Sequence, residues 1–372
     1  MTATGTSDMR YSRQRWLLTL CGLLLYLGDI CTDTALAVRY FQETQYVWSG
    51  MTALFIITGL TVNQVFSYAW FLEKMQEDKE DDEKGQYLVL HAFGMGILVR
   101  YYHLLKDGNK EIQRQNSSEE LNIQELIWKA TDLSMLKLFE TFLESAPQLL
   151  LQLYIHHSHH EWSILQYLAL AFSFFNLAWS LVDYRWLLHK SLLREKKFSL
   201  GATLVYLLYK LFTITSLTLS YSLLLLLNVY CTVGLILIWV LGTIWAKLLD
   251  TDFCKSRVLE PLYRGVIGAI LVFSFFNAKG QNTKREMFLY YLICTIINFS
   301  TPLIFFLSKP EFMEIKLFWA VSGLIYGGSF LGNVSLLLYY SFLSRQENNF
   351  DEVDGVKKET QSARRLKAFI QL

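Results

Sequence analysis

The chain has 372 residues, of which 53% are hydrophobic and only 18% are charged, and its mean hydropathy is +0.27. This composition excludes an ordinary soluble globular domain, and a net charge of +1 provides no basic field for binding nucleic acid. The apolar residues occur in blocks of about 20 or more, which is the length that a helix needs to cross a bilayer. Because the alternation typical of a transmembrane barrel is absent, the sequence predicts an all-α polytopic membrane protein.

Ten apolar segments follow one another along the chain, and each is expected to be helical because backbone polar groups inside a bilayer must be bonded within their own segment. The first is expected to be a retained span, because it has no small-residue cleavage site and contains two aspartates. The segments are 16–41, 46–72, 86–105, 131–157, 162–185, 203–227, 229–249, 260–278, 286–308 and 316–344.

Several of these apolar segments contain charged residues. Asp29 and Asp33 lie four apart on one face of the first segment. Lys137, Glu140 and Glu144 form one stripe in segment 131–157, which Gln148 and Gln152 continue. The other charges in or beside the apolar segments include Asp132, Asp183, Arg185 and Lys210.

An ionised side chain in hydrocarbon costs at least ~2.5–3.5 kcal/mol on insertion scales, so these charges must pair or line a hydrated groove. Three interpretations remain open. The charges hold the helices together, they form a polar path for a lipid headgroup, or they form a site for a coupling ion or proton. Pro147 further predicts a kink or a break in segment 131–157, with Ser145, Pro147 and Gln148 at the joint.

No residue pattern supports enzymatic chemistry or a cofactor, since the chain contains no Walker sequence, no GxSxG and no HExxH. The histidines near residue 160 could bind a metal, but we interpret them as a polar outer loop, so no metal site is predicted. The cysteines contain no CxxC, and most lie in apolar segments as small hydrophobic residues. The residues concerned are His156, His157, His159 and His160, and Cys21, Cys31, Cys231, Cys254 and Cys294.

A short motif follows the last apolar segment. Asp351, Glu352, Val353, Asp354 and Gly355 form an executioner-caspase site, with the cut expected after Asp354. The motif lies in a polar linker, 345–354, which we expect to be exposed. Caspases act in the cytosol, so the motif predicts a cytosolic C-terminus.

The tail 355–372 that follows the motif is basic, and Leu366, Phe369 and Ile370 are spaced as one face of a short amphipathic helix. Such a helix is suited to a cytosolic groove or to an anionic leaflet. The alternative interpretation is a disordered basic tail.

The distribution of charge in the loops predicts the topology. The basic residues of 1–15 place the N-terminus in the cytosol, so the number of spans should be even. Charged loops flank 86–105 and 260–278 on both sides, so neither is expected to cross; each is predicted to be re-entrant or to lie in the cytosolic layer. Eight spans remain, in two parallel pseudo-symmetric halves, 16–200 and 201–344.

At this point the sequence resembles a known family. TDLSMLKLFETFLESAPQLLLQLYI (131–155), YKLFT (209–213) and FFNAKGQNTK (275–284) are similar to segments of the XK-related membrane proteins. The likeness covers essentially all of the predicted membrane-embedded part. The long first segment is its most specific part, and the caspase motif adds to it.

The resemblance implies a phospholipid scramblase of the plasma membrane, which moves lipids between leaflets without ATP and exposes phosphatidylserine on dying cells as an engulfment signal. It implies that a caspase-3-type protease cuts after Asp354, and that some relatives need a single-span chaperone partner. The family's intramembrane charged positions are carried onto Asp29, Asp33, Asp132, Lys137, Glu140, Glu144 and Asp183.

Together these features predict a scramblase held closed by its tail, with Lys210 added to the lipid path. A secondary transporter or channel for a small polar solute is the alternative, and a non-transporting membrane interaction protein is a third. No ATP site is visible, so either kind of transport should run down a gradient.

Overall fold

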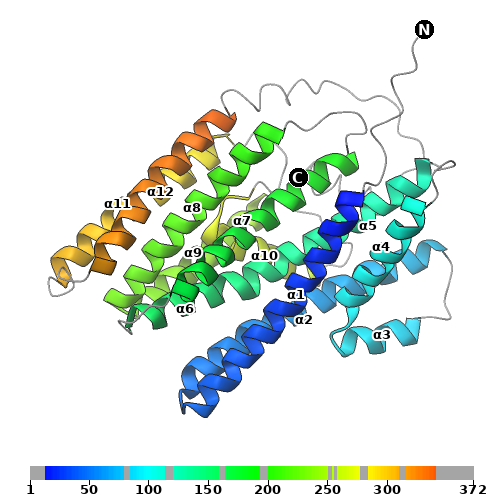
Figure 1. Cartoon of the computed structure of the whole chain (residues 1–372), viewed down its shortest axis with the longest axis horizontal. Coiled ribbons are helices and arrows are strands. Elements are labelled where there is room, and N and C mark those ends of the chain that lie inside the picture. The colour runs from blue at the N-terminus through cyan, green and yellow to red at the C-terminus, as the bar shows by residue number, and fades with distance from the viewer. Residues whose placement is uncertain are drawn as a thin grey trace, which may run out of the picture. The chain divides into compact units, whose positions relative to one another are not determined.

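The structure is a computed structural model that describes residues 13–78, 84–113, 120–158, 164–192, 200–249, 254, 258–276, 284–309 and 316–340. Every regular element within these ranges is a helix (Figure 1). The predicted caspase site at Asp351–Gly355 and the tail residues Leu366, Phe369 and Ile370 lie outside the described residues.

The helices fall on the ten predicted segments, which confirms an all-α chain. Within the described ranges, six helices are long and apolar enough to span a membrane, or seven if the bent pair α3–α4 is one span, which confirms a multi-pass architecture. The predicted number of eight spans and their pseudo-symmetry remain predictions. The elements are α1 (Arg13–Gln42), α2 (Tyr46–Asp78), α3 (Lys84–Ala92), α4 (Gly96–Gln113), α5 (Glu120–Glu140), η1 (Thr141–Ser145), α6 (Ala146–Ser158), α7 (Ile164–Leu192), α8 (Leu200–Leu227), α9 (Cys231–Leu248), α10 (Leu259–Phe273), α11 (Lys284–Ser308) and α12 (Lys316–Leu338).

The chain divides into two compact units. Among the described residues, the first unit contains α1 to α5, η1 up to Glu144, and the end of α7 from Asp183. The second unit contains Ser145, α6, the start of α7 up to Val182, and α8 to α12.

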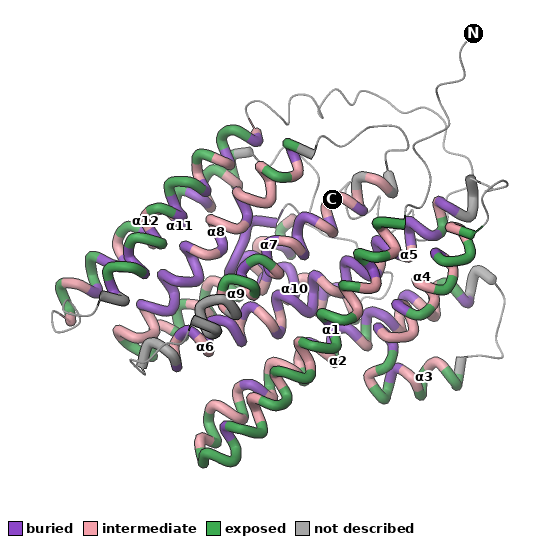
Figure 2. The backbone as a smooth tube through the Cα atoms, in the orientation of Figure 1, coloured by how far each residue is buried: buried purple, intermediate pink, exposed green. Residues whose placement is uncertain are grey.

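Large apolar side chains cover the outer surface of several helices. α1 and α9 are exposed over most of their length (Figure 2). Leu24 on α1, Leu241 on α9 and Leu307 on α11 are 62%, 64% and 71% exposed. Exposed apolar surface on this scale is unfavourable in water and is satisfied by lipid acyl chains. The surface therefore agrees with the membrane class that the composition indicates.

The predicted break in segment 131–157 is present, but it begins before Pro147. The chain forms a π-helical turn, η1, between α5 and α6. Pro147 has no N–H to donate to the carbonyl four residues earlier, which lies within this turn. A single π-helical turn inside an α-helix can accommodate a carbonyl that lacks its usual N–H donor. The helix begins earlier than the apolar segment predicted from 131, because α5 starts at Glu120 with a polar sequence that hydropathy does not detect.

The predicted non-spanning segment 86–105 is a pair of helices, α3 and α4, bent by 115°. Gly94 at the bend has φ 77°, a left-handed conformation that glycine adopts without strain. Gln64 on α2 holds the bend from both sides, since its Nε2 donates to the Gly94 carbonyl at 3.0 Å and its Oε1 accepts from the Gly96 N–H at 3.0 Å. A Cβ on Gly96 would lie 2.5 Å from Gln64 Oε1, so this close approach needs glycine.

The second predicted non-spanning segment contains α10. Its 15 residues give a length of about 22 Å, which is too short to cross a hydrocarbon core of about 30 Å as a straight helix. α10 ends among side chains of α8 and α11, which bond the carbonyls at its end. The Leu271 carbonyl accepts from the Tyr290 hydroxyl at 3.0 Å, and the Val272 carbonyl accepts from the Tyr221 hydroxyl at 3.1 Å. Just beyond the helix, the Phe275 carbonyl accepts from Lys210 Nζ at 2.7 Å. The Ile270 carbonyl is bonded within the chain, by the Ser274 N–H at 2.8 Å.

α9 and α10 pack through glycines on both helices. A Cβ on Gly242 would lie 3.2 Å from the Gly268 Cα, and a Cβ on Gly268 would overlap the Thr243 hydroxyl. The Trp239 indole N–H donates to the Gly265 carbonyl at 2.9 Å. α9 is therefore fixed to α10 by a close backbone approach that larger residues would prevent.

This packing predicts opposite effects of one substitution at two glycines of α10. Gly268→Ala should lower the melting temperature in detergent, because the new methyl group meets Thr243 and a carbonyl 2.8 Å away; overpacking costs about 1–3 kcal/mol. Gly265→Ala is the matched control, because a Cβ there meets no atom within 4 Å, and alanine is favoured over glycine in a helix by about 0.8–1 kcal/mol. Equal melting temperatures for the two variants would contradict the close approach.

Candidate functional site

Four of the predicted charged residues come together in the first unit. Asp29 and Asp33 on α1, Glu140 on α5 and Glu144 on η1 interact electrostatically, and we call them the acidic cluster. The two aspartates are half-buried, whereas Glu140 and Glu144 are 4% and 0% exposed. The sequence placed each pair on its own helix face, and the fold brings the two faces together.

Glu144 is the least satisfied member of the cluster. Neither of its carboxylate oxygens has a hydrogen-bond partner within the described part of the chain. The side chain lies directly against Gly59 of α2, where a Cβ would be 2.7 Å from Glu144 Oε2. Asn63, one turn further along α2, is also fully buried, and neither of its side-chain polar atoms bonds to a described residue. Buried polar groups without partners are costly, so this region is suited to water or to a polar ligand group.

Lys137 supplies positive charge beside the cluster. It interacts electrostatically with Glu140. Its Nζ lies 3.9 Å from the position that a Cβ would take on Gly22 of α1. Tyr26 and Tyr101, with ring centroids 6.2 Å apart, add two buried aromatic side chains on α1 and α4. Four carboxyl groups beside one ammonium group favour the binding of a cationic ligand group over an anionic one.

Asp183 and Asp132 are paired with arginines of the first unit. Arg15 on α1 binds both oxygens of Asp183, at 2.5 and 3.2 Å, and its guanidinium lies 5.3 Å from the Trp186 ring centroid. Arg100 on α4 lies 3.8 Å from Asp132 and donates to the side chain and carbonyl of Ser67 at 2.7 and 2.9 Å. These two carboxylates therefore hold helices together.

Lys210 belongs to the second unit and is 2% exposed. Its ammonium donates to Ser274 Oγ at 2.9 Å and to the Phe275 carbonyl at 2.7 Å, and it lies 4.9 Å from the Tyr209 ring centroid. These bonds fix the chain that leaves α10. A role for Lys210 in a lipid path stays a prediction.

A more exposed ionic network joins α2, α4 and α5. Lys129 contacts Asp107 at 3.0 Å and Glu125 at 3.1 Å, and Lys74 contacts Glu125 at 3.1 Å. Burial opposes ionisation of Glu125, but the charges of Lys129 and Lys74 outweigh it and lower its pKa. The Glu125 and Lys74 side chains are about half exposed, so each contact contributes only about 0–1 kcal/mol.

The sequence predicted which charged residues lie in apolar segments, but it did not predict which residues they contact. Arg15 and Arg100 were visible beside apolar segments, yet 168 and 32 residues separate them from Asp183 and Asp132, so spacing could not pair them. Gly59 and Asn63 were missed because nothing local marks a glycine or an amide as the neighbour of a distant glutamate. Among the described residues, no group of three or more His, Cys, Asp or Glu is arranged to hold a metal ion.

These features define a class of protein: a multi-pass helical membrane protein with carboxyl groups buried between its helices. Residues 17–345 match the model of a family described as XK-related protein. The chain is also 45% identical over 375 residues to XK-related protein 9 of Tetraodon nigroviridis, covering 97% of this chain and 99% of that relative. The chain belongs to the XK-related family.

The Arg15–Asp183 pair predicts a charge-swap result. Asp183→Asn should lower the melting temperature in detergent by several degrees, because it leaves the Arg15 guanidinium without its carboxylate in a site where both side chains are largely covered. We expect the free energy of unfolding to fall by about 2–3 kcal/mol, which is less than for a fully buried ion pair. Arg15→Asp combined with Asp183→Arg should recover part of this loss. If the double variant is no more stable than Arg15→Asp alone or Asp183→Arg alone, the ion pair does not hold these helices together.

Proposed function

We propose that the chain is a phospholipid scramblase of the plasma membrane that exposes phosphatidylserine during apoptosis. The observation that carries the proposal is the acidic cluster, where Glu144 and Asn63 are buried between apolar helices without a hydrogen bond to any residue that the structure describes. Membership of the XK-related family supports it.

In this mechanism the lipid headgroup follows the polar side chains of the first unit while the acyl chains remain in hydrocarbon. A headgroup ammonium is attracted by the excess of carboxyl groups, and Glu144 and Asn63 offer bonds that no described protein group makes. Polar groups in hydrocarbon cost several kcal/mol when unbonded, so such a path lowers the barrier to crossing. Because lipids move down their gradient, no energy source is needed.

The proposed topology has eight spans, made by α1, α2, α5–η1–α6, α7, α8, α9, α11 and α12, with α3–α4 and α10 not crossing. Both termini then lie in the cytosol, where a caspase-3-type protease reaches Asp354. Before cleavage, the 355–372 helix packs on the cytosolic side through Leu366, Phe369 and Ile370 and holds a closed state. Cutting lowers the effective concentration of this helix, and it dissociates.

Purified full-length chain in liposomes tests the function. With a fluorescent lipid in both leaflets and a reductant outside, intact protein should leave about half of the signal protected, and caspase-3 treatment should remove that protection. Asp354→Ala should remain uncut and inactive.

Cleaved protein that moves no lipid would contradict the simple autoinhibition mechanism. If activity then appears on adding a single-span partner, the partner requirement of some relatives applies here. Uptake of a polar solute without lipid movement would favour the alternative, a secondary transporter or channel.

In the proposed mechanism the spans shift once the tail helix has dissociated, and we expect α12 to move relative to α8. α12 is the last described helix before the cleavage site, and it packs on α8 in the second unit. A Cβ at Gly328 would lie 3.4 Å from the Ser216 Cβ, close to the 3.5–4.5 Å of disulfides. In Ser216→Cys/Gly328→Cys, oxidation should keep cleaved protein inactive, and reduction should restore lipid movement. Each single cysteine variant is the control, and full activity of the cross-linked form would exclude movement of α12 from α8.

A further inference from the structure

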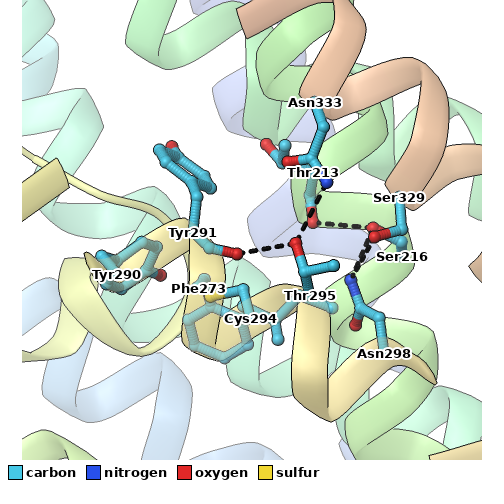
Figure 3. A pocket seen from close by; sticks show the side chains of 11 residues that line it. Thr213, Ser216, Phe273, Tyr290, Tyr291, Cys294, Thr295, Asn298, Ser329 and Asn333 are labelled. Carbon is cyan, nitrogen blue, oxygen red and sulfur yellow. Dashed lines mark hydrogen bonds between the residues drawn. The ribbon is translucent and has the colours of Figure 1, made fainter. Parts of the chain in front are cut away.

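A polar pocket lies inside the second unit, where α8, α11 and α12 contact one another (Figure 3). Each helix contributes polar residues to its wall at a spacing of three or four residues. They are Thr213 and Ser216 on α8, Thr295 and Asn298 on α11, and Ser329 and Asn333 on α12. None of the residues lining the pocket is charged. The proposed lipid path in the first unit does not use it.

The hydroxyl protons in this pocket are largely committed to backbone carbonyls of their own helices. Thr213 donates to the Tyr209 carbonyl at 2.8 Å, Ser216 to Phe212 at 2.8 Å, and Thr295 to Tyr291 at 2.7 Å. A hydroxyl that donates its proton still has two acceptor positions on oxygen. The pocket therefore presents mainly acceptors.

The two amide groups satisfy only part of this acceptor capacity. Asn333 Nδ2 donates to Thr295 Oγ1 at 3.0 Å, and Asn298 Nδ2 donates to Ser216 Oγ at 3.2 Å and to Ser329 Oγ at 3.4 Å. In Figure 3 these oxygens lie around a common space, with Thr213 on its wall. A ligand that fits must therefore be small and must donate hydrogen bonds.

The volume of the pocket and the charge of the nearby Lys210 restrict the kind of ligand further. The space in which the centre of a water molecule fits is about 10 Å³, which is near the minimum for one water. A monovalent cation would also suit acceptor oxygens. However, the Lys210 ammonium is held at Ser274 and Phe275, adjacent to the pocket residue Phe273. Its positive charge in low dielectric opposes a second cation.

We propose that this pocket binds one water molecule, which bridges α12 to α8 and α11. Two hydrogens of the water satisfy hydroxyl acceptors on different helices, and its oxygen accepts from a group such as the Ser329 hydroxyl. The bridge joins three helices through neutral bonds. The proposal does not depend on scramblase activity.

A high-resolution structure of the full-length protein tests the site directly. We expect one density peak in the pocket, at about 2.7–3.2 Å from at least three of the polar atoms, with the same distances in sodium and in potassium buffer. Absence of a peak at a resolution that shows other buried waters would overturn the proposal. A peak with shorter contacts that change with the cation would also overturn it, because it would identify a metal ion.

Two substitutions at Thr213 supply a matched pair. Thr213→Val keeps the side-chain shape and removes one acceptor, so the peak should disappear or lose occupancy. Thr213→Ser retains the hydroxyl and should retain the peak. A peak of undiminished occupancy in a well-folded Thr213→Val protein would show that Thr213 does not bind the water and would overturn the bridge to α8. Should Thr213→Val not fold, the structure of the unmodified chain still decides the proposal.

Discussion

The constraint on which the structure depends is that backbone groups at a helix break need partners inside the protein when the surroundings are apolar. Gln64 meets this need at the α3–α4 bend by bonding both the Gly94 carbonyl and the Gly96 N–H. At the end of α10, the hydroxyls of Tyr290 and Tyr221 bond the Leu271 and Val272 carbonyls, and the Lys210 ammonium bonds the Phe275 carbonyl just beyond the helix. At both breaks these backbone groups are therefore bonded inside the protein.

The same constraint distinguishes the buried polar groups that have partners in the described residues from those that have none there. Asp183 and Asp132 have arginine partners, so they stabilise the packing of α1, α4, α5 and α7. Glu144 and Asn63 are more deeply buried, yet their side chains make no hydrogen bond with any described residue. A buried polar group that the fold leaves unbonded is a cost to stability, and such costs are typical of functional sites. This contrast locates the proposed lipid path on α1, α2, α5 and η1.

The two units bury different kinds of polar side chain between their helices. The first buries carboxyl groups against one another and against Lys137, whereas the residues described as lining the pocket between α8, α11 and α12 in the second are all uncharged. In low dielectric, a polar network whose members are all bonded rigidifies the packing, whereas an unbonded member is costly.

Hydropathy and charge by themselves determined the helical membrane class, the ten segments and the presence of a fault near Pro147, because these follow from local chemistry. The sequence also placed Asp29 with Asp33, and Glu140 with Glu144, each on one helix face. Only the tertiary structure decided that these two faces meet, that Arg15 pairs with Asp183, that Glu144 lies against Gly59, and that Lys210 holds the end of α10. Such contacts join residues far apart in the chain, and a side chain's type and spacing carry no information on which distant helix it will face.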